Sequence, residues 1–176
     1  EKIQSIDVDV VINNAGRGYL KQDVDLSKEE IEEMLQLNLY TLIQTTQHYL
    51  PKFIKKKSGM FVQIASQAGK TATPKTSVYS ASKFGVLGYS NALRLELKEQ
   101  GIHVMTVNPG PIATQFFEKA EPTGKYLASV SQYVLTSEEV AREIVRGMKL
   151  QKREVNVPYS MNLAAKLNFC FPKIGD

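Results

Sequence analysis

The sequence of 176 residues contains one cysteine and no tryptophan. A single thiol, Cys170, excludes an internal disulfide, which is typical of a reducing compartment. The first residues, "EKIQSIDVDV", have the pattern of neither a signal peptide nor a transit peptide. We therefore expect a cytoplasmic protein.

Long apolar runs and a strong charge are also lacking. The longest uncharged run, Met34 to Pro51, contains Asn, Gln, Thr and His, so we expect no membrane span and no membrane partner. The net charge is only +4, and its one basic cluster, Lys55 to Lys57, is typical of a solvated helix end, so we expect no nucleic-acid partner. An apolar fraction of 43% and a charged fraction of 23% indicate one globular domain over residues 1–176.

Strand-like and helix-like segments alternate along the chain. Strands are predicted at 9–13, 60–66, 102–111 and 153–158. Helices are predicted from a Ser27/Glu30 capping box towards Lys57, as one helix or two, and at 77–100, 136–148 and 160–171. This order favours an α/β fold with a doubly wound, Rossmann-like parallel sheet and helices on both faces.

Three of the predicted strands end in small or polar residues: "NNAG" at 13–16, "ASQAG" at 65–69 and "NPGP" at 108–111. Ligands of such sheets bind outside the carboxyl ends of the strands. These ends therefore predict a ligand-lined rim, although plain turns have similar compositions.

The predicted helix 77–100 carries a face of small residues, Ala81, Gly85, Gly88 and Ala92. Each internal glycine costs about 1 kcal/mol relative to alanine, so we expect a close approach by another backbone, from the sheet or from a partner helix. The other sides of this helix are apolar as well. Such a helix packs either in a subunit interface or in the core of its own chain.

Tyr79 and Lys83 lie four residues apart in "SVYSASK" and share one face of this helix. Chance produces such pairs readily, so the spacing alone decides nothing. Ser66 lies at the end of the preceding strand, and Asn38 falls on the apolar stripe of an earlier helix. A buried Asn needs hydrogen-bond partners and is often simply a satisfied core residue.

Five segments, in this order, resemble the short-chain dehydrogenases/reductases. They are "NNAG" at Asn13–Gly16, "LNLY" around Asn38, the strand-end Ser66, "YSASK" at Tyr79–Lys83 and "NPGPIAT" at Asn108–Thr114. The resemblance implies an NAD(P)-dependent oxidoreductase that interconverts a carbonyl and an alcohol by hydride transfer. A non-catalytic nucleotide sensor or scaffold on the same fold is the alternative.

The resemblance also implies roles for individual residues. Tyr79 would be the general acid/base, with Lys83, helped by the cofactor's positive nicotinamide, lowering its pKa towards neutral. Ser66 would donate a hydrogen bond to the substrate oxygen. Asn38 would hold a water that links Lys83 to solvent. Cofactor contacts would come from Tyr79 and Lys83 and from two loops, which contribute Asn13, Asn14, Ala15 and Gly16, and Pro109, Gly110, Ile112 and Thr114.

The family's glycine-rich dinucleotide fingerprint does not occur in this sequence. The chain resembles the C-terminal two-thirds of a family member, with about 80 residues expected before it. Such a piece is expected neither to fold stably alone nor to hold a dinucleotide. The choice between NAD and NADP therefore stays open, with NADP slightly favoured because reductases commonly use it.

Residues 115–135 correspond to the family's mobile lid over the substrate. Their aromatic residues indicate either an apolar carbonyl or alcohol substrate or simple packing of the lid. The resemblance and the apolar helix 77–100 together predict a homodimer or homotetramer, built on helices 39–56 and 78–98.

Overall fold

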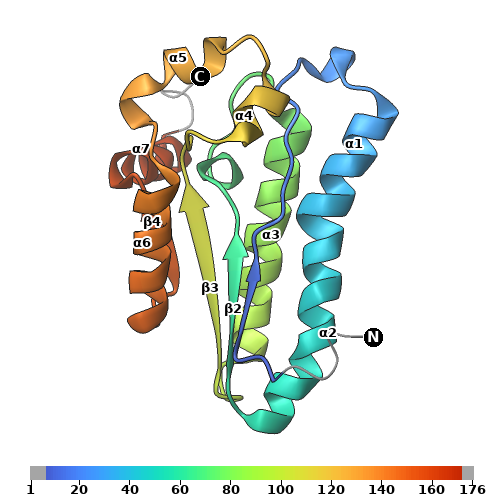
Figure 1. The fold of residues 1–176 in the computed structure, drawn as a ribbon, viewed down its shortest axis with the longest axis vertical. Coiled ribbons are helices and arrows are strands. Elements are labelled where there is room, and N and C mark those ends of the chain that lie inside the picture. The colour runs from blue at the N-terminus through green and yellow to red at the C-terminus, as the bar shows by residue number, and fades with distance from the viewer. Residues whose placement is uncertain (1–6, 172–176) are drawn as a thin grey trace.

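The computed structural model describes residues 7–171. Its four strands are parallel and lie in chain order, with each strand hydrogen-bonded to the next one along the sequence. They are β1 (Val10–Asn13), β2 (Gly59–Ile64), β3 (Ile102–Pro109) and β4 (Glu154–Val157). Parallel neighbours need crossover connections, and helices supply each of them (Figure 1).

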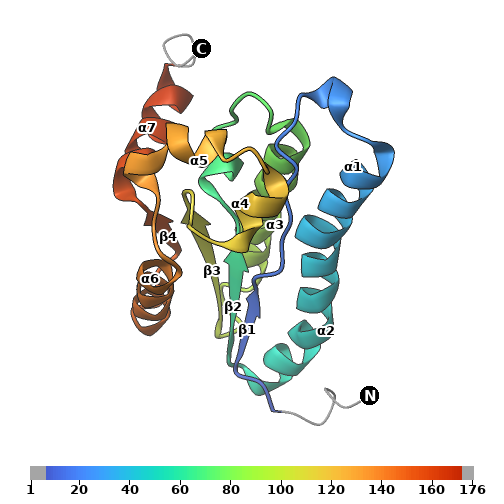
Figure 2. The ribbon, with the colours of Figure 1, turned by 45° about the horizontal axis from the view of Figure 1, so that its top comes forward.

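Long helices cover both faces of the sheet. Figures 1 and 2 show α2 and α3 on one side and α6 on the other. The helices are α1 (Lys28–Leu35), α2 (Thr41–Lys56), α3 (Ser77–Glu96), α6 (Ser137–Lys149) and α7 (Tyr159–Cys170). Two short helices, α4 (Gln115–Ala120) and α5 (Lys125–Ser129), precede α6. The Rossmann-like doubly wound fold is confirmed.

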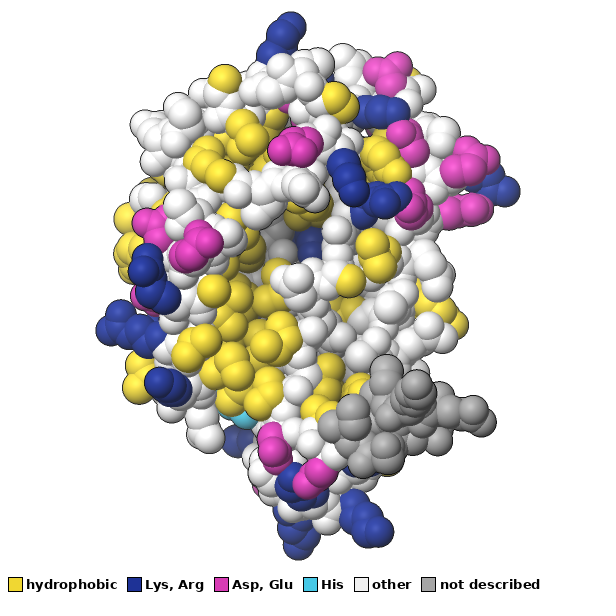
Figure 3. Space-filling model, viewed as in Figure 1, with side chains coloured by type: hydrophobic (Ala, Val, Ile, Leu, Met, Phe, Trp, Pro, Cys, Tyr) yellow, Lys and Arg dark blue, Asp and Glu magenta, His cyan; other side chains and the backbone are white. Residues whose placement is uncertain are grey.

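Successive side chains along a strand point to opposite faces of the sheet, so the sheet separates two hydrophobic cores. Phe61 of β2 packs with side chains from α2 and α3, whereas its neighbour Val62 belongs to the cluster on the α6 side. Burying each such side chain contributes about 1.5–3 kcal/mol. On the face turned to the viewer, hydrophobic side chains gather around a hollow (Figure 3), and Ile12 of β1 is 50% exposed.

The predicted elements agree with the structure to within a few residues. The capping boxes at Ser27/Glu30 and Thr136/Glu139 are both present. The helix that begins at Lys28 continues to Lys56 through a five-residue π-helical turn, Gln36–Tyr40. The helix predicted at 77–100 ends earlier, at Glu96.

The small-residue face of α3 lies at the surface. Ala81, Gly88 and Ala92 are exposed, and a Cβ at Gly88 would have no described atom within 4 Å. A Cβ at Gly85 would meet a side chain, that of Leu39, at 2.8 Å. Within residues 7–171, therefore, the expected close backbone approach to these glycines does not occur, and the sheet side of α3 is formed by other residues.

Candidate active site

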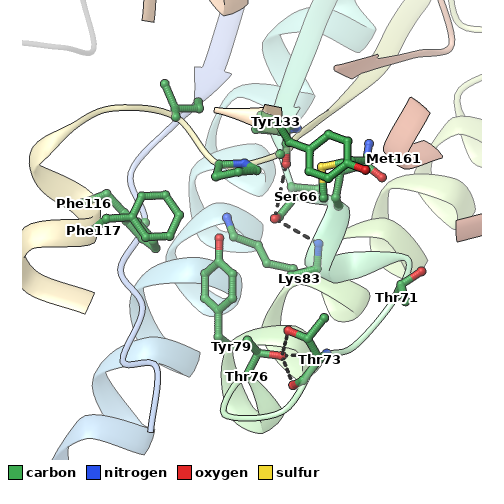
Figure 4. A pocket seen from close by; sticks show the side chains of 18 of the residues that line it. Ser66, Thr71, Thr73, Thr76, Tyr79, Lys83, Phe116, Phe117, Tyr133 and Met161 are labelled. Carbon is green, nitrogen blue, oxygen red and sulfur yellow. Dashed lines mark hydrogen bonds between the residues drawn. The ribbon is translucent and has the colours of Figure 1, made fainter. Parts of the chain in front are cut away.

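A cavity of ≈ 800 Å³ opens at the carboxyl ends of the strands. The predicted rim segments at the ends of β1, β2 and β3 all contribute to its wall. Ser66, Tyr79 and Lys83 line it together, so the structure brings three of the four predicted catalytic residues to one space. Figure 4 shows Tyr79 and Lys83 pointing into the same part of the cavity.

Ser66 follows β2 and begins a 3₁₀ turn, Gln67–Gly69. Its hydroxyl oxygen accepts a hydrogen bond from the Ala68 N–H at 3.1 Å and lies 3.5 Å from the Pro109 carbonyl oxygen, to which it donates. The turn therefore fixes the Ser66 side chain at the edge of the cavity. Its third residue, Gly69, packs directly against the backbone of α3.

Tyr79 lies in the first turn of α3 and is half-buried. Burial raises the pKa of Tyr79 to about 12, and the neighbouring Ser66 hydroxyl opposes this rise. Within the described chain, loss of hydration outweighs this polar neighbour. The expected shift of the Tyr79 pKa towards neutral also depends on the positive charge of the nicotinamide and stays a prediction. A tyrosine in this state is protonated at pH 7.

Lys83 lies one turn further along α3 and is only 4% exposed. Its Nζ donates a hydrogen bond to the Ile64 carbonyl oxygen at 2.9 Å and lies 5.9 Å from the centroid of the Tyr79 ring. Burial lowers the pKa of Lys83 to about 8. At pH 7 the side chain is still mostly charged.

Asn38 lies in the π-helical turn behind the cavity and does not line it. Its Oδ1 accepts from the Arg17 N–H at 2.7 Å, and its Nδ2 donates to the Arg17 carbonyl oxygen at 2.8 Å and to Ser82 Oγ at 3.0 Å. Both amide hydrogens are thus used within the protein. The side chain thereby holds the loop after β1. The role of Asn38 in holding a water near Lys83 stays a prediction.

The residues at the end of β1 and in the loop after it have two different roles: one side chain bonds to the core, and the others line the cavity. Asn13 does not line the cavity, because its Nδ2 donates to Gln63 Oε1 at 2.8 Å and to Thr46 Oγ1 at 3.2 Å. Asn14, Ala15 and Gly16 do line it. The prediction of cofactor contacts therefore fits these three residues geometrically, whereas the Asn13 side chain is committed to the core.

The turn after β3 forms the facing wall. Pro109, Gly110, Ile112 and Thr114 all line the cavity, as the predicted contacts require. Thr114 is the N-cap of α4, and its hydroxyl accepts from the Phe116 N–H at 3.4 Å. This cap fixes the start of α4 against the turn after β3, at the edge of the cavity.

Aromatic side chains from residues 115–135 cover another side of the cavity. Phe116 lies 5.7 Å from Tyr79 between ring centroids, and Phe117 stacks on Tyr126 at 5.4 Å. Tyr133 also lines the cavity (Figure 4). A Cβ at Gly18 would stand 2.7 Å from Phe116, so this glycine makes room for the aromatic group.

No pattern in the sequence indicated that α7 forms part of the site. Met161, Ala164 and Ala165 of this helix line the cavity, together with Gln67 of the turn after β2. Small and apolar residues at helical spacing look the same whether they face a core or a cavity, so no sequence signal distinguished them.

Two other kinds of site can be assessed over the described part of the chain. Residues 7–171 contain no group of three or more His, Cys, Asp or Glu side chains placed to hold a metal ion. None of the helices in that range has both the length and the apolar character needed to cross a membrane.

A parallel sheet wound on both faces, with a ligand-sized cavity at its carboxyl ends, defines a Rossmann-like α/β protein. A model of the short chain dehydrogenase family matches residues 2–125. The chain is 34% identical over 151 residues to the ketoacyl reductase HetN of Nostoc sp., an alignment that covers 85% of this chain and 51% of that protein. The chain belongs to the short chain dehydrogenase family and spans about half the length of this relative.

Solved structures share the fold. A short-chain dehydrogenase from Sphingobium yanoikuyae in complex with NADPH superposes with a TM-score of 0.82 at 24% identity, covering 99% of this chain and 68% of the other. A 4-hydroxyisoleucine dehydrogenase complexed with NADH has a TM-score of 0.78 at 21% identity, covering 89% and 69%.

Proposed function

We propose that the protein is an NAD(P)-dependent oxidoreductase that interconverts a carbonyl and an alcohol by hydride transfer. The observation that carries this proposal is the convergence of Ser66, Tyr79 and Lys83 on one cavity, between the loop after β1 and the turn after β3. Family membership supports the same reaction class. A nucleotide sensor has no use for a buried Tyr–Lys pair beside a serine hydroxyl, so the non-catalytic alternative is disfavoured.

Tyr79 is the proposed proton donor in the reductive direction. Its raised pKa keeps the hydroxyl protonated at neutral pH, ready to donate to an alkoxide oxygen as charge grows there. Ser66 donates a hydrogen bond to the same oxygen and stabilises that charge. In the oxidative direction Tyr79 must first lose its proton, and positive charge at the site favours that loss.

The residues around Lys83 fit the nicotinamide half of a dinucleotide. A Cβ at Gly16 would lie 3.4 Å from both Lys83 Nζ and Asn38 Oδ1, so the bare glycine leaves backbone open beside the ammonium. Within the described chain Lys83 Nζ donates to one acceptor, and an ammonium has three donors, which leaves two for ribose hydroxyls. The proposed holders are Asn14–Gly16, Lys83 and the Pro109–Thr114 turn.

When bound, the nicotinamide supplies or accepts the hydride. NADP is slightly favoured because reductases commonly use it, and HetN is named as a reductase. The structural relatives were solved with NADPH or with NADH, so they support a nicotinamide cofactor of either kind.

The proposed substrate is a small carbonyl compound or alcohol with an apolar portion. Phe116, Phe117, Tyr126 and Met161 present aromatic and apolar surface next to Ser66 and Tyr79. Residues 115–135 would act as a lid over that portion. A ketoacyl compound meets this description, and HetN is named as a ketoacyl reductase.

A homodimer or homotetramer is proposed through the outer surfaces of α2 and α3. The outer face of α3 combines the open surface at Gly88 with Phe84, which is 46% exposed, and Leu95, which is 72% exposed. A face of this kind offers apolar area and close approach to a matching helix.

The cytoplasmic location expected from the sequence also stays a prediction.

The direct test is NADPH and NADH oxidation by the intact protein with 3-oxoacyl thioesters of increasing chain length. Turnover by the parent protein and its loss in Tyr79→Phe would support the proposal. Equal turnover by the two proteins would refute the proton-transfer role. Dinucleotide binding without turnover of any carbonyl or alcohol would favour the sensor alternative.

A further inference from the structure

A polar network lies behind the cavity wall, where the turn after β2 meets β3, β4 and α7. Lys70 Nζ donates to Glu154 Oε2 at 2.8 Å and to Asn162 Oδ1 at 3.0 Å. Glu154 Oε2 also accepts from Asn108 Nδ2 at 3.1 Å. Asn108 is fully buried and Asn162 is only 3% exposed, whereas the Lys70–Glu154 ion pair is partly open to solvent.

Lys70 is rigidly connected to Ser66. Its backbone N–H donates to the Gln67 carbonyl oxygen at 2.9 Å and closes the 3₁₀ turn that Ser66 begins. On the other side of this turn, Gly69 rests on the backbone of α3 at Lys83. A displacement of Lys70 would therefore be transmitted to the Ser66 hydroxyl over four residues of tight turn.

Asn162 connects the same network to α7. The preceding residue, Met161, lines the cavity and reaches the turn after β3, since a Cβ at Gly110 would stand 2.7 Å from its sulfur. The outer side of α7 is open, with Leu163 and Leu167 both exposed. Apolar packing is non-directional, so it does not by itself fix α7 in one position. The hydrogen bond from Lys70 to Asn162 has a defined geometry and supplies that constraint.

We propose that Lys70 and Asn162 are positioning residues, whose hydrogen bond fixes α7 against the Ser66 turn and thereby sets the width of the cavity where α7 forms its wall. This inference rests on the proposed function for its catalytic readout. Neither residue is among those that line the reacting end of the cavity around Ser66, Tyr79 and Lys83. Their effect is on geometry, and the substrates most affected are those that depend on contact with α7.

Asn162→Ala is the principal test, because it removes the bond to α7 and keeps the Lys70–Glu154 ion pair. Asn162→Asp is the matched variant, since it preserves an acceptor oxygen of the same size for the Lys70 ammonium. Lys56→Met serves as the control. It removes an exposed pair, in which Lys56 Nζ lies 2.6 Å from Asp9 Oδ1, at the opposite end of the sheet.

Two measurements are made on each intact protein: hydrogen–deuterium exchange in α7 without substrate, and kcat and KM for 3-oxoacyl thioesters of short and long chain. In Asn162→Ala we expect faster exchange confined to α7 and its neighbours. We also expect kcat/KM to fall by about 10- to 100-fold, mainly through KM and unequally between short and long chains. Lys56→Met should resemble the parent in both measurements. Asn162→Asp should lie closer to the parent than Asn162→Ala does, because it keeps the bond to Lys70 but places a second carboxylate beside Glu154.

The exchange measurement does not depend on catalysis. Unchanged exchange of α7 in Asn162→Ala would overturn the fixing role, even if the parent protein reduces no carbonyl compound. Faster exchange with an unchanged dependence on chain length would overturn the effect on cavity width. If Asn162→Ala fails to fold, Lys70→Gln removes the same bond to α7 together with the Glu154 ion pair, and Lys70→Arg, which retains a cation for both acceptors, is its conservative partner.

Discussion

The backbone of Gly69 lies in contact with the backbone of Lys83. A Cβ at position 69 would stand 2.8 Å from the Lys83 carbonyl oxygen and 2.9 Å from its carbonyl carbon. Backbone atoms inside a helix cannot move aside as the end of a flexible side chain can. This contact therefore fixes the distance between the turn that carries Ser66 and the helix that carries Tyr79 and Lys83.

Gly69→Ala should consequently weaken both the fold and the site. We expect a loss of about 1–3 kcal/mol in the free energy of unfolding, because the added methyl group overpacks a rigid contact. Thermal denaturation measures this loss as a melting temperature lowered by about 2–4 °C per kcal/mol. Turnover should fall as well, because the Ser66 turn must move away from α3.

Gly88→Ala is the matched control for that substitution. It is also a glycine-to-alanine change, but its Cβ would meet no described atom within 4 Å. Within a single chain it should raise the free energy of unfolding by about 1 kcal/mol through helix propensity. Equal effects of the two substitutions would show that the contact with Lys83 does not determine the outcome at position 69.

Tyr79→Phe should abolish turnover and leave dinucleotide affinity nearly unchanged, since it removes the proposed transferable proton and keeps the ring beside Phe116. The expected loss in kcat is at least about 10²–10⁴-fold. Steady-state kinetics and fluorescence titration with NADPH measure the two quantities. Tyr133→Phe, which changes another tyrosine in the cavity wall, should retain most of the activity.

The lowered pKa of Lys83 leads us to expect that dinucleotide affinity depends on pH. Burial lowers its pKa to about 8, so the ammonium proposed to bind the ribose is present below that pH and is lost above it. The Kd for NADPH should therefore be flat below pH 7 and rise above pH 8, by up to about tenfold per pH unit. Lys83→Met should bind weakly at every pH, and a Kd in the parent that stays constant up to pH 10 would contradict the proposal.

Rising pH should also change the free energy of unfolding through Lys83, but it should raise stability where it lowers dinucleotide affinity. Between pH 8 and the ordinary lysine value of 10.5, the unfolded chain binds a proton at Lys83 that the folded chain does not. The free energy of unfolding should therefore gain from this group as pH rises through that window. Denaturant titrations at pH 8 and pH 10 should show a smaller gain in Lys83→Met than in the parent.

Ala92→Arg should dissociate the proposed oligomer without harming the chain's own fold. Ala92 is exposed on the outer face of α3, one turn from Gly88, so a charged side chain there meets solvent in a monomer and a partner in an oligomer. Light scattering at micromolar concentration measures the change. Ala141→Arg, at an exposed position of α6, should leave the mass unchanged, and a monomeric parent protein would refute the assembly.

The sequence predicted the order of elements well because each signal is local. Capping boxes, glycine breaks and apolar periodicity are all encoded within a few residues, and they placed every long helix and every strand of the described chain. The gathering of Ser66, Tyr79 and Lys83 at one rim followed from the rule for parallel sheets. Residues far apart in the sequence were therefore placed correctly where the topology of the sheet alone determines their position.

Side-chain direction was harder to predict. The sequence did not reveal the partners of the Asn13 and Asn38 side-chain amides, which are Gln63 and the Arg17 backbone, 50 and 21 residues away. The assignment of both residues to the site stays a prediction. The Tyr79 pKa likewise depends on how much protein surrounds the ring, which no spacing reveals. The Lys70–Asn162 bond spans 92 residues and leaves no trace in local sequence.

The order of the four strands has a consequence for how the chain assembles. Each strand of the described sheet after β1 pairs with the strand made just before it, so it finds a partner that has already been synthesised. Ser66, Tyr79 and Lys83 all precede β3 in the chain, whereas α7 follows every strand of the described sheet. During translation, therefore, the proposed reacting groups leave the ribosome well before α7, and the part of the cavity wall that α7 forms closes only later.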